Sequence, residues 1–272
     1  MLVCSFAPFI KLFFVELLFT DTHTHLYSEE FENDSHQMLQ RAFDNGVKRL
    51  FVPSIDSSYT SSMKALQQLY PEHIFLMMGL HPCYVKTESY EKELEKNKKK
   101  IKSNTYYAVG EIGIDLYWDK STLDIQKEAF KKQIQWAKQH KLGINIHCRE
   151  AFDEVFEVLE SEKSDDLFGI FHCFSGNLEQ ANQAIRLGMK LGIGGVVTFK
   201  NGKIDQFLHQ ISLKDIVLET DAPYLAPVPY RGKRNESSYI PIIAQKLAEI
   251  HQVSIAEIAE ITTNNAKEIF SI

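Results

Sequence analysis

The stretch LLFTDTHTH at residues 17–25 joins an apolar run to two histidines that lie one residue apart. The apolar part is typical of a buried β-strand. Side chains at positions i and i+2 of a strand share a face and lie about 6.5–7 Å apart. His23 and His25 can therefore converge on one metal ion, because imidazole is the commonest metal-binding side chain. An isolated pair is weak evidence, so this interpretation depends on matching ligands further along the chain.

Seven more short apolar runs follow, and longer amphipathic segments separate them. The expected strands are Leu17–Thr22, Arg49–Ser54, Ile74–Leu80, Tyr106–Glu111, Gly143–His147, Phe168–His172, Lys190–Gly194 and Ile216–Thr220. Helices are expected near residues 34–45, 58–70, 88–103, 122–141, 150–163, 177–188 and 203–211, and again after 238. This alternation predicts an α/β fold, a single (β/α)8 TIM barrel. The competing open doubly wound sheet is disfavoured, because no glycine-rich phosphate loop follows the first strand.

Length and composition are those of an ordinary globular protein with one domain. The chain has 272 residues, and we assign the barrel to residues 17–272. Residues 1–16 form an apolar extension to which we assign no role. Lys11 and Glu16 interrupt the apolar segment at the N-terminus, and it lacks a basic start and a small-residue cleavage site, so neither a secretory signal nor a membrane span is expected. The net charge of −6 argues against broad electrostatic adhesion to nucleic acid.

The four cysteines carry little functional signal. They are Cys4, Cys83, Cys148 and Cys173, and no two of them form a Cys-x-x-Cys pair. Neither a zinc ribbon nor a dithiol redox motif is therefore supported. We interpret them as reduced thiols and expect a cytoplasmic location.

Metal-capable side chains recur where the predicted strands end. They are His23 and His25 after strand one, His81 after strand three, Glu111 at the end of strand four, His147 after strand five, His172 after strand six and Asp221 after strand eight. In a closed barrel the carboxyl ends of all strands meet at one face. Each residue alone has an ordinary alternative, a helix N-cap for the carboxylates or a core histidine for the imidazoles. Their joint placement predicts a metal site at the C-terminal face.

The mixture of ligands limits the chemistry. Apart from His81, the set contains four imidazoles and two carboxylates, more than one tetrahedral ion needs, so we expect two divalent ions. A carboxylate such as Glu111 can bridge two ions at a separation of about 3.5–4 Å. Thiolate ligands are absent from the set, which is compatible with Mg²⁺, Mn²⁺ or Zn²⁺. Hydrolysis by a water that the ions activate is the natural reaction, and we expect no organic cofactor.

Taken together, these segments resemble the TatD-type metal-dependent deoxyribonucleases. The resemblance rests on residues 21–26 (DTHTHL), 79–82 (GLHP), 110–115 (GEIGID), 147–151 (HCREA), 172–176 (HCFSG), 219–225 (ETDAPYL) and 229–236 (PYRGKRNE). It implies a TIM barrel of the amidohydrolase type, dependence on divalent metal and hydrolysis of DNA phosphodiester bonds. Two positions depart from the family pattern: Thr24 replaces a usual Cys, and Ser237 replaces a frequent Pro. Neither is a proposed ligand.

Carried over residue by residue, the resemblance implies a role for each motif. His23, His25 and Asp221 would hold one ion, Glu111 would bridge, and His147 with His172 would hold the second. The residues facing the substrate would be His81, Arg149, Arg231 and Asn235. A guanidinium can pair with a phosphate through two hydrogen bonds, which suits both arginines. Asp221 would orient or deprotonate the attacking water, and His81 would stabilise the phosphate oxygens or the leaving group.

We therefore expect a monomeric exonuclease that acts on DNA, on single strands or strand ends, without a membrane partner. A metal-dependent deacylase of aminoacyl-tRNA or a small-molecule amidohydrolase remains an alternative. Many small-molecule amidohydrolases bridge their metals with a modified lysine on strand four, and Glu111 occupies that place here. A nucleic-acid-binding protein without catalysis is a further alternative. Metal content measured together with phosphodiester turnover separates the three.

Overall fold

The structure is a computed structural model that describes residues 17–101 and 105–272. The predicted apolar extension, residues 1–16, and Cys4 within it lie outside the described residues. Within the described ranges, no helix combines the length and the apolar composition that crossing a membrane requires.

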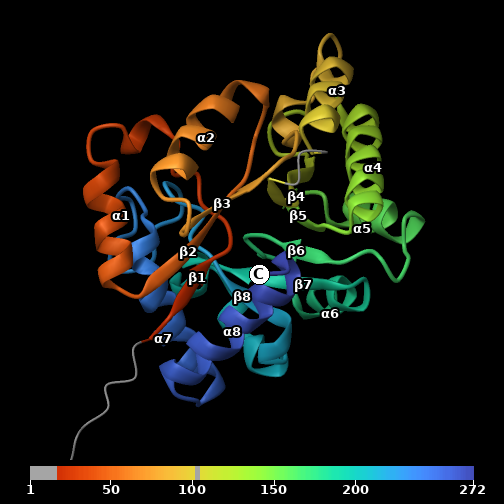
Figure 1. Cartoon of the computed structure of the whole chain (residues 1–272). Coiled ribbons are helices and arrows are strands. Elements are labelled where there is room, and N and C mark those ends of the chain that lie inside the picture. Colours follow the sequence, from red (N-terminus) through yellow and green to blue (C-terminus); the bar gives the residue numbers. More distant parts are fainter. Residues whose placement is uncertain (1–16, 102–104) are drawn as a thin grey trace, which may run out of the picture.

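The predicted barrel is confirmed. Eight parallel strands pair in the order of the sequence, each with the next, and helices alternate with them around the outside (Figure 1). The amide of Thr22 donates to the carbonyl of Leu218 at 3.0 Å, which places the first strand beside the last. The strands are β1 (Phe19–Asp21), β2 (Val47–Val52), β3 (Ile74–Met77), β4 (Tyr106–Asp115), β5 (Gly143–Arg149), β6 (Gly169–Phe171), β7 (Met189–Ile193) and β8 (Ile216–Leu218).

The helices follow the predicted pattern with one exception. They are α1 (Ser35–Asp44), α2 (Thr60–Leu69), α3 (Tyr90–Ile101), α4 (Leu123–His140), α5 (Phe152–Ser161), α6 (Leu178–Arg186), α7 (Ile240–His251) and α8 (Ile255–Phe270). The helix expected at residues 203–211 is wrong: this segment forms two 3₁₀ turns, Ile204–Gln206 and Leu208–Gln210. Its apolar residues have helical spacing, but Lys203 is left-handed with a φ of 61°, and Phe207 between the two turns has a φ of −125°, so the backbone does not continue as one helix.

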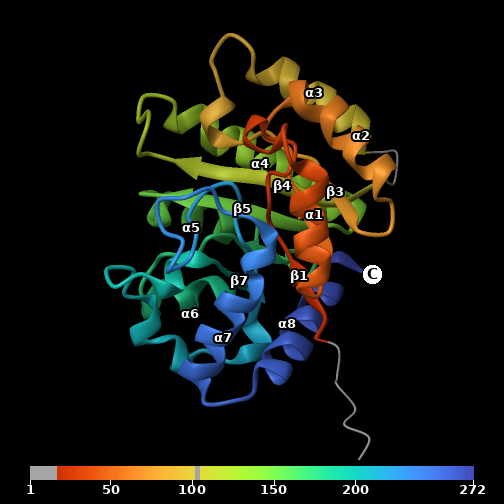
Figure 2. The same cartoon turned by 90° about the vertical axis from the view of Figure 1, so that its left-hand side faces the viewer.

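The core has two layers, because successive side chains of a strand point to opposite faces. Leu50 and Val52 of β2 face outward and pack under the surrounding helices, whereas Phe51 between them faces the barrel interior. The interior cluster is completed by apolar residues of α8, which lies over the barrel end in Figure 2. Phe270 of α8 stacks on Phe51 with ring centroids 3.5 Å apart. Apolar side chains thus fill the amino-terminal half of the barrel.

An irregularity in β4 turns Glu111 into the barrel. Val109 pairs with Ile144 and Ile112 pairs with Ile146, so β4 has three steps where β5 has two. Because side chains alternate, one extra residue reverses which face the following residues point to. Val109 and Ile112 therefore both pack in the outer layer, and Glu111 between them faces inward. The expectation that Glu111 ends strand four is wrong, since β4 continues to Asp115.

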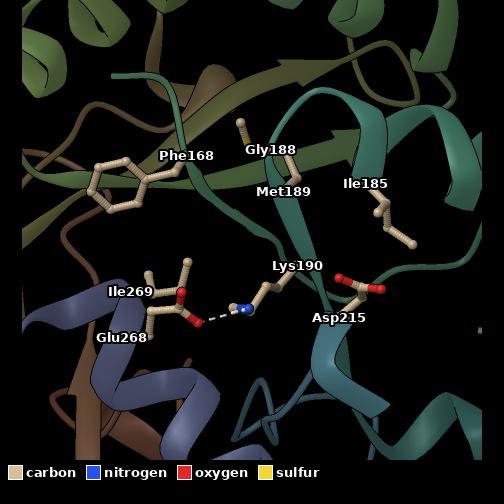
Figure 3. Close-up of a pocket in the computed structure, with 8 residues that line it drawn as sticks. All are labelled: Phe168, Ile185, Gly188, Met189, Lys190, Asp215, Glu268 and Ile269. Atoms are coloured by element: carbon tan, nitrogen blue, oxygen red, sulfur yellow. Dashed lines mark ion pairs between the residues drawn. The ribbon is translucent and has the colours of Figure 1, made fainter. Parts of the chain in front are cut away.

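A surface hollow lies at the amino-terminal end of the barrel, beside the end of α8. Its lining residues lie next to the amino ends of β6, β7 and β8 and on α6 and α8: Phe168, Ile185, Gly188, Met189, Lys190, Asp215, Glu268 and Ile269. Figure 3 shows Lys190 reaching across it to Glu268, with a nitrogen-to-oxygen distance of 3.1 Å. None of these residues belongs to the predicted metal site.

The close approach of β4 to β5 depends on Gly113, which has a φ of 140°. A Cβ at this position would lie 2.0 Å from the carbonyl oxygen of His147. We predict that Gly113→Ala lowers the free energy of unfolding by about 3 kcal/mol, because backbone strain adds to overpacking. Denaturant unfolding measures the change. Gly232→Ala is the control, because Gly232 also has positive φ but has no atom within 4 Å of its Cβ position. Equal losses in the two variants would contradict the steric explanation.

Candidate metal centre

The carboxylate of Glu111 is the point on which the predicted ligands converge. Four histidines, His23, His25, His147 and His172, surround it together with His81, and Asp221 lies beside the first two. Glu111 is only 2% exposed, so it lies inside the barrel rather than at its rim. The structure therefore brings together all seven metal-capable residues that the sequence placed on this face.

One oxygen of Glu111 faces the first set of ligands. Its Oε2 lies 3.3 Å from Nε2 of His23 and 3.5 Å from Nε2 of His25. Oδ1 of Asp221 lies 3.6 Å and 3.4 Å from the same two nitrogens, which are 3.1 Å from each other. Four ligands about 2.1 Å from a tetrahedral ion would lie about 3.4 Å apart. The ligand atoms of His23, His25 and Asp221 all lie within 4.8 Å of one another, so these three residues have the spacing of ligands around one ion.

The other oxygen of Glu111 faces a second set. Its Oε1 lies 2.8 Å from Nδ1 of His147, 3.0 Å from Nε2 of His172 and 3.2 Å from Nε2 of His81. His147 Nδ1 and His172 Nε2 are 3.4 Å apart. Glu111 thus presents one oxygen to each set.

The environment of Glu111 fits a cation. Its Oε2 is buried and has no hydrogen-bond partner, which is costly for a carboxylate unless a positive charge compensates it. Burial alone would raise the pKa of Glu111, but the surrounding imidazoles of His81, His172 and His23 hold it well below its usual range. Burial, followed by the neighbouring His172, lowers the pKa of His23 and so favours the neutral ring that metal binding needs.

Asp221 reaches the centre from a short loop, not from the end of a strand. It follows β8 by three residues and has a φ of 57°. Its amide donates to the carbonyl of His23 at 2.9 Å. Asp21 stabilises this loop from β1, since its side chain accepts from the amide and the hydroxyl of Thr220 at 2.9 and 2.6 Å. Burial raises the pKa of Asp21 to about 7, although these hydrogen bonds oppose the shift.

A second group of residues, which the sequence did not reveal as functional, orients the imidazoles. The nitrogen of each ring that points away from the centre has a polar neighbour: Asn145 Oδ1 at 2.7 Å for His23, Tyr27 Oη at 3.0 Å for His25, Asp115 Oδ2 at 2.9 Å for His147 and Glu219 Oε1 at 3.5 Å for His172. The first three contacts are hydrogen bonds, which hold a proton on the outer nitrogen and leave the inner one free to bind metal. The outer nitrogen of His172 makes no hydrogen bond. Asp115 and Glu219 lie inside the motifs quoted above, and this position could have indicated a functional role. Asn145 and Tyr27 lie outside those motifs, so nothing in the sequence indicated a role for them.

His81 differs from the other histidines. Its Nδ1 accepts a hydrogen bond from the amide of Cys83 at 3.0 Å. In the neutral ring the proton must then be on Nε2, the nitrogen that faces Glu111. His81 therefore presents a donor to the centre, which suits a substrate oxygen better than a metal ion.

The remaining predicted substrate residues are placed differently from one another. Arg149 is exposed at the end of β5, and Arg231 is exposed in the loop before α7 with its guanidinium 4.4 Å from the ring of Phe199. Asn235 is fully buried, and its amide donates to the carbonyls of Thr220 and Tyr224 at 2.7 and 2.6 Å. This placement differs from the substrate contact expected, because the amide hydrogens are bonded to backbone. Asn235 instead supports the loop that carries Asp221.

The fold and this centre define a metal-dependent hydrolase of the TIM-barrel class. Residues 20–271 match the family model described as TatD related DNase, and the chain belongs to that family. It is 38% identical over 254 residues to an uncharacterized metal-dependent hydrolase YabD of Bacillus subtilis, covering 93% of this chain and 98% of the relative. It is 29% identical over 259 residues to a protein of Yersinia pseudotuberculosis named 3′-5′ ssDNA/RNA exonuclease TatD, covering 93% and 99%. The predicted resemblance is confirmed.

The fold comparison agrees with the sequence comparisons. The crystal structure of YjjV, a TatD homologue from Escherichia coli K12, superposes with a TM-score of 0.89 at 29% identity. The match covers 95% of this chain and 100% of the other. The overall fold of this chain is therefore that of the TatD homologue.

We predict that Asp115→Ala weakens metal binding about 10- to 100-fold, because His147 loses the acceptor that fixes its ring. Titration calorimetry with Mn²⁺ measures the affinity. Asp119→Ala is a matched control, since Asp119 lies in the loop that follows β4 and its side chain accepts hydrogen bonds from Ser121 and not from a group near the centre. Affinities that fall equally in both variants, or in neither, would contradict the orienting role of Asp115.

Proposed function

We propose that the protein is an exonuclease that hydrolyses DNA phosphodiester bonds at the ends of single strands, with two divalent ions as cofactors. The observation that carries this proposal is the position of Glu111, whose two oxygens face two separate sets of ligands. His23, His25 and Asp221 would hold one ion, and His147 with His172 would hold the other. Bound Mg²⁺, Mn²⁺ or Zn²⁺ ions supply Lewis-acid chemistry, polarising a phosphoryl oxygen and making a water molecule more acidic.

Residues of the chain would transfer the proton, stabilise charge on the phosphate and bind the DNA strand. The side chain of Asp221 is 14% exposed and that of Glu111 is 2% exposed, so Asp221 is the more accessible of the two carboxylates and would accept the proton of the attacking water. His81 donates from Nε2 toward the same space and would stabilise charge on the phosphate oxygens. Arg149 and Arg231, exposed on the surrounding loops, would bind phosphates of the strand.

Two findings support a nucleic-acid substrate. The family model carries the name TatD related DNase, and the Yersinia relative is named for single-stranded DNA and RNA. The net charge of −6 is consistent with a local mode of binding, through metal ions and a few arginines, rather than with a broad basic surface. A monomeric state and a cytoplasmic location remain predictions.

We predict that the purified protein shortens end-labelled single-stranded DNA in the presence of Mg²⁺ and that EDTA abolishes the reaction. His147→Ala and Asp221→Ala should each lower kcat/KM at least about 100-fold, because each removes a ligand of the proposed ions. Gel analysis of products from 3′- and 5′-labelled strands measures the rate and shows the polarity of cleavage.

His140→Ala is the control for these variants, because His140 ends α4 on the outside of the barrel. It should cleave at the rate of the unchanged protein. Cleavage by His147→Ala and Asp221→Ala at that same rate would contradict the proposed function. Parallel assays with RNA, aminoacyl-tRNA and a lactone show whether another ester is the preferred substrate.

We predict that His81→Ala lowers kcat about 100-fold while the protein keeps its full metal content, because His81 contributes a hydrogen-bond donor and no ligand. Metal analysis of the purified variant by mass spectrometry and steady-state kinetics provide the two measurements. A variant that loses one ion together with its activity would show that His81 is a ligand instead.

A further inference from the structure

Large apolar side chains are exposed mainly around the metal centre. Nine of them are exposed among the described residues, and six lie on loops at the carboxyl end of the barrel: Tyr84, Tyr117, Trp118, Tyr224, Leu225 and Val228. Trp118 is the most exposed of the six, with 71% of its surface accessible. Exposed apolar side chains that gather beside a polar site are typical of a binding surface.

The positively charged guanidinium of Arg149 lies against two of these rings. Its guanidinium carbon lies 3.7 Å from the ring centroid of Tyr117 and 5.6 Å from that of Trp118. A guanidinium stacked on a ring has its donors directed along its edge, where they can meet a phosphate. The three residues therefore combine an exposed aromatic surface with an anion-binding group, which matches the base and the phosphate of one nucleotide.

This cluster is connected directly to the metal centre. Oδ1 of Asp115 accepts from the amides of Tyr117 and Trp118 at 3.0 and 3.2 Å, and Oδ2 of the same carboxylate is 2.9 Å from Nε2 of His147. One buried carboxylate thus sets the position of the aromatic turn relative to the centre. The backbone reinforces the connection, since the amide of Leu116 donates to the carbonyl of Arg149 at 3.0 Å.

We infer that Tyr117, Trp118 and Arg149 form a subsite for an unpaired nucleotide next to the bond that is cut. The base stacks on the indole of Trp118, and the phosphate of the same nucleotide pairs with Arg149. Stacking on an aromatic ring accepts any base, but the base must be free of its complementary strand. The subsite therefore explains a preference for single strands and rests on the proposed function, because it assumes a polynucleotide substrate.

The kinetic test compares Trp118→Ala with Leu69→Ala in the presence of Mg²⁺. Leu69 is 73% exposed at the end of α2 and is a matched control for loss of an exposed apolar side chain. Trp118→Ala should raise KM for a ten-nucleotide thymidine strand about tenfold with little change in kcat, as removal of one stacking contact predicts. Trp118→Phe should restore most of the affinity, and Leu69→Ala should match the unchanged protein.

A strand with base-free residues at its terminal positions separates stacking from other effects. On this strand the unchanged protein and Trp118→Ala should have the same KM, because no base remains to stack. A rise in KM that is equal on both strands, or absent on both, would overturn the inference.

Fluorescence gives a measurement that does not depend on turnover. The chain has two tryptophans, and Trp136 in α4 is only 8% exposed, so quenching by added thymidine strand reports on Trp118. The unchanged protein should be quenched and Trp118→Phe should not. Quenching without cleavage would leave the subsite standing and overturn the exonuclease, whereas cleavage without quenching would overturn the subsite alone.

Discussion

The placement of one buried carboxylate, that of Glu111, is the constraint on which the rest of this structure depends. An ionised carboxylate inside a barrel is costly unless positive charge and hydrogen bonds compensate it. Five imidazoles supply that environment, and three of them are hydrogen-bonded to a side chain behind the ring: His23 to Asn145, His25 to Tyr27 and His147 to Asp115. The amino-terminal half of the barrel is filled by apolar side chains of the strands and of α8, and the polar half is built on it.

The strand irregularity explains how the fold tolerates a carboxylate at that depth. A regular β4 would place residue 111 on the same face as Val109, among the apolar contacts of the outer layer. The extra residue between Val109 and Ile112 reverses the alternation and directs Glu111 inward. Glycine makes the rearrangement possible, because a Cβ at Gly110 would lie 2.6 Å from the Cβ of Asn145 on β5. The chemistry of the centre therefore follows from a local packing feature.

Periodicity and strand ends were sufficient to predict the barrel and the gathering of His23, His147 and His172 on one face, because parallel strands share a direction. They were not sufficient to locate Glu111 within β4, since a bulge arises from the approach of two backbones and leaves no periodic signal. Asn235 could not be placed for a related reason. The resemblance implied a polar residue near the substrate, but only the fold shows that its amide is bonded to backbone carbonyls of the Asp221 loop.

Glu111 and Asp115 each fix the relative position of two groups. Each is a carboxylate on β4 that uses its two oxygens for different partners, Glu111 for the two ligand sets and Asp115 for His147 and the aromatic turn. Cleavage at the end of a DNA strand requires the phosphorus atom and the neighbouring base to be held at a fixed separation. Because both carboxylates project from one strand, that separation is set by the geometry of β4 itself. A shift of β4 would displace Glu111 and the inferred subsite together, so the alignment of these two would persist through small motions of the barrel.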